Sequence, residues 1–200
     1  MKDTVIVFAR APRLGAVKRR LAEQIGARAA LRFHIATTTT LLRRLGSTRR
    51  FRTVLAVTPD QARVALAFRG PRIDQGSGDL GRRMDRAFWR FRSGRVALLG
   101  SDIPDAGRMD IQAAFDALGR TDAVFGPATD GGYWLVALGS RRPSSPFHHV
   151  RWSSPHALAD TLRNFKGRRV GFLRVLQDVD TYQDLITVSQ NRRNSGYTHD

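Results

Sequence analysis

The sequence predicts an α/β protein in which a mostly parallel sheet lies between two layers of helices. Short apolar runs alternate with longer segments in which apolar residues recur at helical spacing, which is the pattern of strand–helix–strand units. Several of the runs, such as residues 4–9 and 96–99, show no polar alternation. Strands buried on both faces read in this way, and such strands are typical of parallel sheets.

In the first half of the chain, glycine and proline mark the boundaries of the expected elements. Gly26 separates two helical patterns, and Gly46 ends the second of them. Thr58 and Pro59 are expected to open a third helix, because proline is favoured in the first helical turn. The expected order is strand 4–9, helices 17–25 and 27–45, strand 53–57, helix 59–68 and strand 72–75.

In the second half, apolar residues from Met84 to Phe91 share one face of an expected helix. Asp105 is expected to cap the helix that follows the next strand. The expected order is helix 82–91, strand 96–99, helix 109–118, strands 123–125 and 133–138, helix 153–165, strand 170–173 and a short last helix.

The composition favours a globular protein, because 42% of the 200 residues are hydrophobic. Residues 1–189 are expected to form a single domain, and the polar residues 190–200 a disordered tail. No apolar run reaches the roughly 18 residues that span a bilayer, and no signal peptide is recognisable, so we expect a cytoplasmic protein. The absence of cysteine excludes disulfides and cysteine nucleophiles. Because Glu23 is the only glutamate, any catalytic or metal-binding carboxylate is expected to be an aspartate.

The formal net charge is +17, and almost all of the basic residues are arginine. They are spread along the whole chain, and aromatic residues do not alternate with them in an RNA-binding pattern. We interpret the charge as a solvated surface that attracts anionic ligands. Binding to RNA stays open as an alternative.

Residues 96–105, Val-Ala-Leu-Leu-Gly-Ser-Asp-Ile-Pro-Asp, indicate a ligand site. Asp102 directly follows a strand expected in the middle of the sheet, and open α/β sheets bind ligands at the carboxyl ends of their strands. A carboxylate at that edge of an arginine-rich chain favours a divalent metal, Mg²⁺ or Mn²⁺, together with a phosphorylated ligand. A simple turn is the alternative interpretation.

Two further loops supply candidate donor-binding residues. Arg10, Gly15 and Lys18 lie in a basic, flexible loop after the first strand, which suits a di- or triphosphate, although a solvated basic turn has the same composition. Gly78 and Asp79 belong to a glycine-rich segment whose backbone can approach a ligand. The spacing of its glycines matches the Gly-x-Gly-x-x-Gly fingerprint of dinucleotide-binding proteins. The acidic residue that binds the ribose in those proteins is missing, so the match is weak.

Asp130 lies in the most specific segment of the sequence, Gly-Pro-Ala-Thr-Asp-Gly-Gly at residues 126–132. An acid followed by two glycines between buried strands permits close approach of a ligand to the backbone. A hairpin turn also uses Asp-Gly, but it does not explain the preceding Gly-Pro.

Five segments of the sequence, taken together, are typical of one protein family. They are Phe-Ala-Arg-x-Pro-x-x-Gly-x-Val-Lys at 8–18, Gln-Gly-x-Gly-Asp-Leu-Gly-x-Arg-Met at 75–84, Gly-Ser-Asp-x-Pro-Asp at 100–105, Gly-Pro-Ala-x-Asp-Gly-Gly-Tyr at 126–133 and Asp-Val-Asp-Thr at 178–181. In this order they resemble the bacterial glycosyltransferase-A-fold proteins labelled arsenosugar-biosynthesis or selenodomain-associated glycosyltransferases. More distantly, they are similar to the guanylyltransferases of phospholactate and molybdenum-cofactor synthesis.

The resemblance implies a three-layer, Rossmann-like glycosyltransferase-A (nucleotide-diphospho-sugar transferase) fold. It implies that Asp102 occupies the metal-binding position, that the first loop meets the nucleotide phosphates, and that Asp180 lies in the segment that completes related metal sites. Asp130 would face the acceptor or the transferred group. Because the segment at Asp102 is not a full Asp-x-Asp, Asp130 or Asp180 would complete the metal site.

The leading hypothesis is a metal-dependent glycosyltransferase that uses a nucleotide-sugar donor and a small-molecule acceptor. A metal at Asp102 would stabilise the leaving group, and Asp130 would activate the acceptor hydroxyl as a base. One alternative is a nucleotidyltransferase that acts on a phosphorylated small molecule. The other is a non-catalytic protein that binds anions or RNA.

Overall fold

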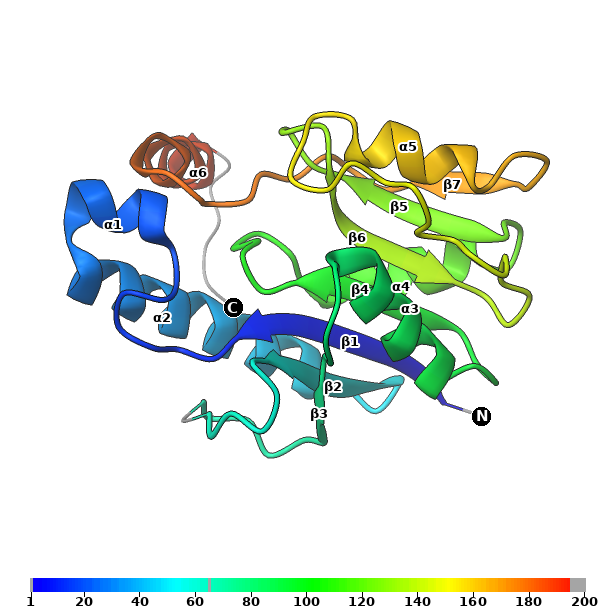
Figure 1. Cartoon of the computed structure of the whole chain (residues 1–200), viewed down its shortest axis with the longest axis horizontal. Coiled ribbons are helices and arrows are strands. Elements are labelled where there is room, and N and C mark those ends of the chain that lie inside the picture. Colours follow the sequence, from blue (N-terminus) through cyan, green and yellow to red (C-terminus); the bar gives the residue numbers. More distant parts are fainter. Residues whose placement is uncertain (1, 65, 195–200) are drawn as a thin grey trace.

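The computed structural model describes residues 2–64 and 66–194 and confirms the α/β class. Seven strands form one sheet in the order β3-β2-β1-β4-β6-β5-β7 (Figure 1). The sheet is mostly parallel, with β6 antiparallel to both of its neighbours. The strands are β1 (Asp3–Arg10), β2 (Phe51–Thr58), β3 (Arg72–Asp74), β4 (Val96–Gly100), β5 (Ala123–Pro127), β6 (Tyr133–Leu138) and β7 (Val170–Phe172).

Helices cover both faces of the sheet, which gives the expected three layers. On one face, α3 packs through Met84 and Phe88, and α5 adds Leu158 and Leu162 at the margin. On the other face, α2 and α4 supply a second apolar cluster. The helices are α1 (Arg19–Ile25), α2 (Ala27–Gly46), α3 (Leu80–Arg90), α4 (Arg108–Ala117), α5 (Ala157–Arg163) and α6 (Tyr182–Asn194).

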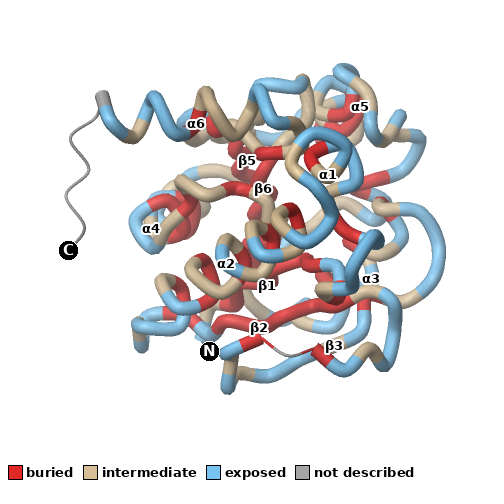
Figure 2. Tube along the Cα trace, turned by 90° about the vertical axis from the view of Figure 1, so that its left-hand side faces the viewer, coloured by how far each residue is buried: buried red, intermediate tan, exposed pale blue. Residues whose placement is uncertain are grey.

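The order of the strands creates a switch point beside β1. The chain passes from β1 to β2 and β3 on one side, and then returns to β4 on the other side of β1. The carboxyl ends of β1 and β4 therefore flank the crevice in which open α/β sheets bind ligands. Figure 2 faces this edge and shows buried strand segments from β2 through β1 to β6 and β5. The helices α1 and α6 contact one another here.

The helix expected at residues 59–68 is wrong. Among the described residues of this stretch there is only a turn followed by irregular chain. The guanidinium of Arg72 donates hydrogen bonds to the carbonyls of Val64, Leu66 and Phe68 at 3.0, 3.3 and 3.1 Å. These bonds satisfy backbone groups that a helix would otherwise pair internally.

The last helix is longer than expected. Because α6 extends to Asn194, residues 190–194 are helical and not disordered, while the remainder of the expected tail, 195–200, lies outside the described residues. Arg192 of this helix pairs with Asp105 at 2.6 Å. Asp105 was expected to cap α4, but Gly107 is the N-cap and its N–H donates to Asp110. No helix in the described part of the chain is long and apolar enough to cross a membrane.

Candidate functional site

The candidate site is centred on an ammonium group between two carboxylates. Lys18 Nζ lies 2.9 Å from Asp102 Oδ2 and 2.8 Å from Asp180 Oδ1. The Lys18 side chain is only 4% exposed, whereas those of Asp102 and Asp180 are 41% and 49% exposed. Three segments that are far apart in the sequence therefore meet at the carboxyl ends of β1 and β4.

The backbone places each member of this cluster. Asp102 lies just beyond β4, and its carbonyl accepts a hydrogen bond from the N–H of Val179 at 3.2 Å, which fixes Asp180 beside it. Lys18 precedes α1 with a left-handed backbone, φ 49° and ψ 48°. This conformation costs a non-glycine residue about 1–2 kcal/mol, so the two ion pairs offset a local strain.

The charges in the cluster influence one another strongly. Burial alone would lower the pKa of Lys18, but the charges of Asp102 and Asp180 outweigh it and the pKa is raised, so Lys18 is cationic. Burial, followed by the charges of Asp180 and Asp130, raises the pKa of Asp178 to about 6. Asp178 is a member of the site that the sequence analysis quoted only as part of a motif.

His34 is a second member that no sequence motif indicated. It lies on α2 and is 3% exposed, with Nδ1 3.9 Å from Asp102 Oδ1. Its Nε2 lies 3.0 Å from the carbonyl oxygen of Arg10, and since a carbonyl only accepts, Nε2 carries a proton. The ring therefore lies between the carbonyl group of Arg10, at the end of β1, and the carboxylate of Asp102. From the sequence, a histidine within an apolar helical pattern is indistinguishable from a core residue.

Arg10 and Arg83 are two further cations near the carboxyl end of β1. Burial, and then the like charge of Arg10, lowers the pKa of Arg83, which shows that the two guanidinium groups influence each other. Gln75 holds Arg83 in place, because its Oε1 accepts a hydrogen bond from Arg83 at 3.1 Å while its amide donates to the carbonyls of Ala9 and Ala56. Two adjacent cations suit an anionic ligand such as a phosphate. Arg83 was not among the predicted site residues.

The other predicted donor-binding residues have local structural roles. Gly15 lies in the exposed turn of the first loop with φ 74°. Gly78, with φ 100°, lies in the loop before α3, where its conformation favours glycine. Asp79 is the N-cap of α3, and its Oδ1 accepts a hydrogen bond from the N–H of Arg82 at 2.8 Å. The structure thus gives Asp79 a structural function as a helix cap.

Asp130 lies on the turn between β5 and β6. It is exposed, and its Oδ1 accepts a hydrogen bond from the N–H of Gly132 at 2.8 Å. It lies at the same edge of the sheet as the Lys18 cluster, because β5 and β4 run in the same direction, and its charge contributes to the raised pKa of Asp178. Within the described chain it forms no hydrogen bond or ion pair with Lys18, Asp102 or Asp180, so it lies beside the cluster and not in it.

The fit to a divalent cation is partial. Asp102 and Asp180 offer the oxygen ligands that Mg²⁺ and Mn²⁺ prefer. However, nowhere in residues 2–64 and 66–194 does a group of three or more His, Asp and Glu side chains gather that could hold a metal ion. Both carboxylates bind Lys18 instead. A cation shared by these two carboxylates would have to displace the ammonium group.

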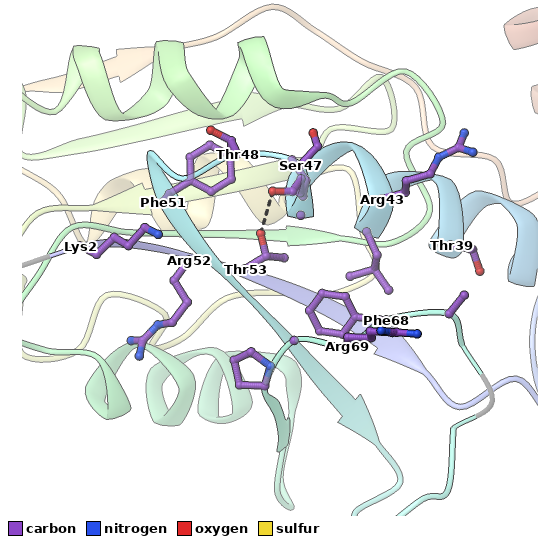
Figure 3. Close-up of a pocket in the computed structure, with 16 residues that line it drawn as sticks. Lys2, Thr39, Arg43, Ser47, Thr48, Phe51, Arg52, Thr53, Phe68 and Arg69 are labelled. Carbon is purple, nitrogen blue, oxygen red and sulfur yellow. Dashed lines mark hydrogen bonds between the residues drawn. The ribbon is translucent and has the colours of Figure 1, made fainter.

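A separate groove of about 820 Å³ lies at the opposite edge of the sheet, where β1 and β2 begin (Figure 3). Its lining includes four basic residues and no acidic one, namely Lys2, Arg43, Arg52 and Arg69. Because the strands are parallel, this amino edge is remote from Lys18 and Asp102. The groove is therefore not part of the candidate site.

Comparison with solved structures shows the same fold elsewhere. A nucleotide-diphospho-sugar transferase from Desulfovibrio desulfuricans, an assignment that is itself provisional, superposes with a TM-score of 0.90 at 29% identity, over 98% of this chain and 90% of that one. CMP:2-keto-3-deoxy-manno-octonic acid synthetase in complex with CTP gives 0.60 at 13% identity, over 98% and 100%. Rv0371c of Mycobacterium tuberculosis in complex with manganese gives 0.53 at 16% identity, over 95% and 99%.

These matches confirm the nucleotide-diphospho-sugar transferase fold that the sequence motifs implied. Among curated proteins, no sequence matches the chain. The model of one protein family matches residues 41–154, which is more than half of the chain and includes the segments around Gly78, Asp102 and Asp130. The chain therefore belongs to the family described as "Uncharacterized protein conserved in bacteria (DUF2064)".

Proposed function

We propose that the protein is a metal-dependent transferase that uses a nucleotide-activated donor, and that its reaction is glycosyl transfer from a nucleotide sugar to a small-molecule acceptor. The observation that carries the proposal is the meeting of Lys18, Asp102 and Asp180 at the switch point of the sheet. The structure of highest identity described above bears a nucleotide-diphospho-sugar transferase assignment, which supports the same class.

In this proposal, the basic residues of the site bind the donor phosphates and its carboxylates bind the metal ion. Lys18, Arg10 and Arg83 bind and orient the donor phosphates, because cations that share one edge of a sheet neutralise a diphosphate. Asp102 and Asp180 hold the Mg²⁺ or Mn²⁺. When bound, such an ion stabilises the negative charge of the leaving group.

Asp130 is the candidate base. Its carboxylate is exposed at the site's edge, on a turn that its own hydrogen bond to Gly132 stabilises. From there it can accept the proton of an acceptor hydroxyl that enters from solvent. The backbone conformation at Gly131, with φ 83°, orients this turn.

Nucleotidyl transfer is a second candidate. In that reaction a phosphorylated acceptor attacks a nucleoside triphosphate and releases pyrophosphate. The positive charges of Arg10 and Arg83, in addition to that of Lys18, favour it because a triphosphate carries more charge than a diphosphate. The relative complexed with CTP has the same fold.

A thermal-shift screen with nucleotide sugars and nucleoside triphosphates, each with and without Mg²⁺ or Mn²⁺, tests the proposal. We expect a metal-dependent rise in melting temperature for one nucleotide sugar. A rise confined to one triphosphate would select nucleotidyl transfer. The Asp102→Asn variant should remain folded and lose the ligand-dependent rise. No rise for any nucleotide in the wild type would contradict both transferase hypotheses.

A further inference from the structure

Lys18 lies where a cation shared by Asp102 and Asp180 would have to bind. Its Nζ is within 2.9 Å of one oxygen from each carboxylate, and its side chain is almost completely buried. Within the described residues, the only other basic group near either carboxylate oxygen is the His34 ring, 3.9 Å from Asp102. The ammonium group is thus the main counter-charge of this pair.

The loop that leads to Lys18 is exposed in its middle part and buried at Val17, directly before Lys18. Residues 13–16 of the loop are exposed, and Gly15 within it has φ 74°. Lys18 itself holds a left-handed backbone, and no side chain caps α1 at this residue. The carboxylates of Asp102 and Asp180 are half-exposed on the solvent side, so a metal ion or a phosphate can reach the cluster without prior unfolding.

We propose that Lys18 is a displaceable internal competitor of the divalent cation, and that donor phosphate relieves the competition. Two carboxylates cannot neutralise an ammonium group and a divalent ion at the same place, since the two cations repel one another. A phosphate offers the ammonium group a different anionic partner. Metal and donor phosphate therefore bind with positive coupling, and each binds weakly alone. The coupling rests on the proposed function, because it requires a phosphorylated donor at this site.

Titration of Mn²⁺, followed by the electron paramagnetic resonance signal of the free ion, tests the competition without any nucleotide. We expect the Lys18→Met variant to bind Mn²⁺ at least about tenfold more tightly than the wild type, because the competing charge is gone. The matched control is Lys166→Met, which removes an exposed lysine elsewhere and should leave Mn²⁺ affinity unchanged. Adding Asp102→Asn to Lys18→Met should abolish the gain. Equal Mn²⁺ affinity of the wild type and Lys18→Met overturns the proposal.

A second measurement uses the wild-type chain and so does not depend on the folding of any variant. The sequence contains only three lysines, so a protein labelled with ¹⁵N at the lysine side chains gives three ammonium signals. We expect Mg²⁺ together with pyrophosphate to shift the Lys18 signal and to leave the Lys166 signal in place. A Lys18 signal that does not move overturns the coupling to donor phosphate.

The outcomes separate this inference from the proposed function. A transferase in which Lys18 does not compete would still show nucleotide-dependent thermal shifts, with no gain of Mn²⁺ affinity in Lys18→Met. Conversely, a gain of Mn²⁺ affinity in Lys18→Met without any nucleotide binding would support the competition between Lys18 and the metal ion and contradict the proposed transferase function.

Discussion

At the scale of single residues, the structure distinguishes charges that are paired from charges that are not. Asp85 on α3 belongs to the second group. Its Oδ1 is buried without a hydrogen-bond partner in the described structure, and burial, the largest cause, raises its pKa to about 6. The neighbouring residues Gly81 and Phe88 contact the loop that contains Phe147, so the carboxylate faces that packed loop and not open water.

Asp85 should make the protein less stable as the pH rises. Since its pKa is about 6 in the fold and 3.8 in the unfolded chain, the folded protein binds the proton more tightly between these values. The free energy of unfolding should therefore fall from about pH 4 to about pH 6 by roughly 1 kcal/mol, a value reduced because Asp85 is only partly buried. Melting curves of Asp85→Asn should match the wild type at pH 4 and lie higher at pH 8. A lower melting temperature of Asp85→Asn at pH 8 would mean that the carboxylate has a stabilising partner.

We expect the charge of Arg83 to contribute to ligand binding and its side chain to contribute little to the stability of the fold. Its hydrogen bonds go to Gln75 and to the carbonyl of Asp79 on an exposed side of α3. We expect Arg83→Gln to weaken nucleotide binding by roughly tenfold, the value of one charge-assisted hydrogen bond, with little change in melting temperature. Isothermal titration with the nucleotide that responds in the thermal-shift screen measures this. Arg90→Gln, on the same helix, is the control, and equal losses in both variants would mean that only the general surface charge matters.

At the scale of elements, the sequence predicted what depends on periodicity and not what depends on distant partners. The strands at residues 96–99 and 133–138 were evident, because continuous apolar runs between glycines admit few alternatives. The false helix at 59–68 had favourable local signals. The stretch is irregular instead, because the guanidinium of Arg72 binds backbone carbonyls four to eight residues before it. The local sequence pattern does not indicate such a contact.

The candidate site shows the same division. Motifs identified Lys18, Asp102 and Asp180 as members of separate loops, but only the strand order places both carboxylates within 3 Å of the Lys18 ammonium group. His34 lies on a helix with an ordinary amphipathic pattern, so sequence reasoning had no signal for it. Arg83 is a fixed position of the segment quoted at 75–84, but nothing in that segment indicated that its side chain belongs to the site. Their assignment to the site depends on the packing of α2 and α3 against the carboxyl edge.

The turn between β5 and β6 depends on its fit against the segment before α5. A Cβ added to Gly131 would lie 2.3 Å from the carbonyl oxygen of Pro155, and Gly131 has φ 83°. The carbonyl of Gly131 also accepts a hydrogen bond from the N–H of Leu158 at 3.1 Å. We expect Gly131→Ala to lower the free energy of unfolding by about 2 kcal/mol, because the clash is with backbone and the conformation is strained.

Urea unfolding measures this change. Gly139→Ala is the control at the other end of β6, because an added Cβ there meets nothing within 4 Å. It should change the free energy of unfolding by less than about 0.5 kcal/mol. Equal stability of both variants would show that the segment around Pro155 yields readily and does not fix the Asp130 turn.

At the scale of the whole molecule, the two edges of the sheet differ in the kind of charge they present. The carboxyl edge combines carboxylates with cations, as a metal–phosphate ligand requires. The amino edge has the groove of Figure 3, whose basic residues include Arg43 and Arg69. Neither of these two makes an ion pair with any residue of the described chain. With a net charge of +17, non-specific attraction of polyanions is expected everywhere on the surface.

Reversing the charge of the groove separates such attraction from donor binding. We expect the double variant Arg43→Glu, Arg69→Glu to weaken binding of a short RNA and to flatten its dependence on log[salt] by about two, because each lost phosphate contact removes roughly one released counterion. Nucleotide-dependent thermal shifts should stay unchanged, since the candidate site lies at the opposite edge. The control, Arg90→Glu with Arg120→Glu, changes the net charge equally. If the control weakens RNA binding as much, the attraction is a property of the total charge; if the groove variant abolishes the nucleotide response, the donor site has been placed at the wrong edge of the sheet.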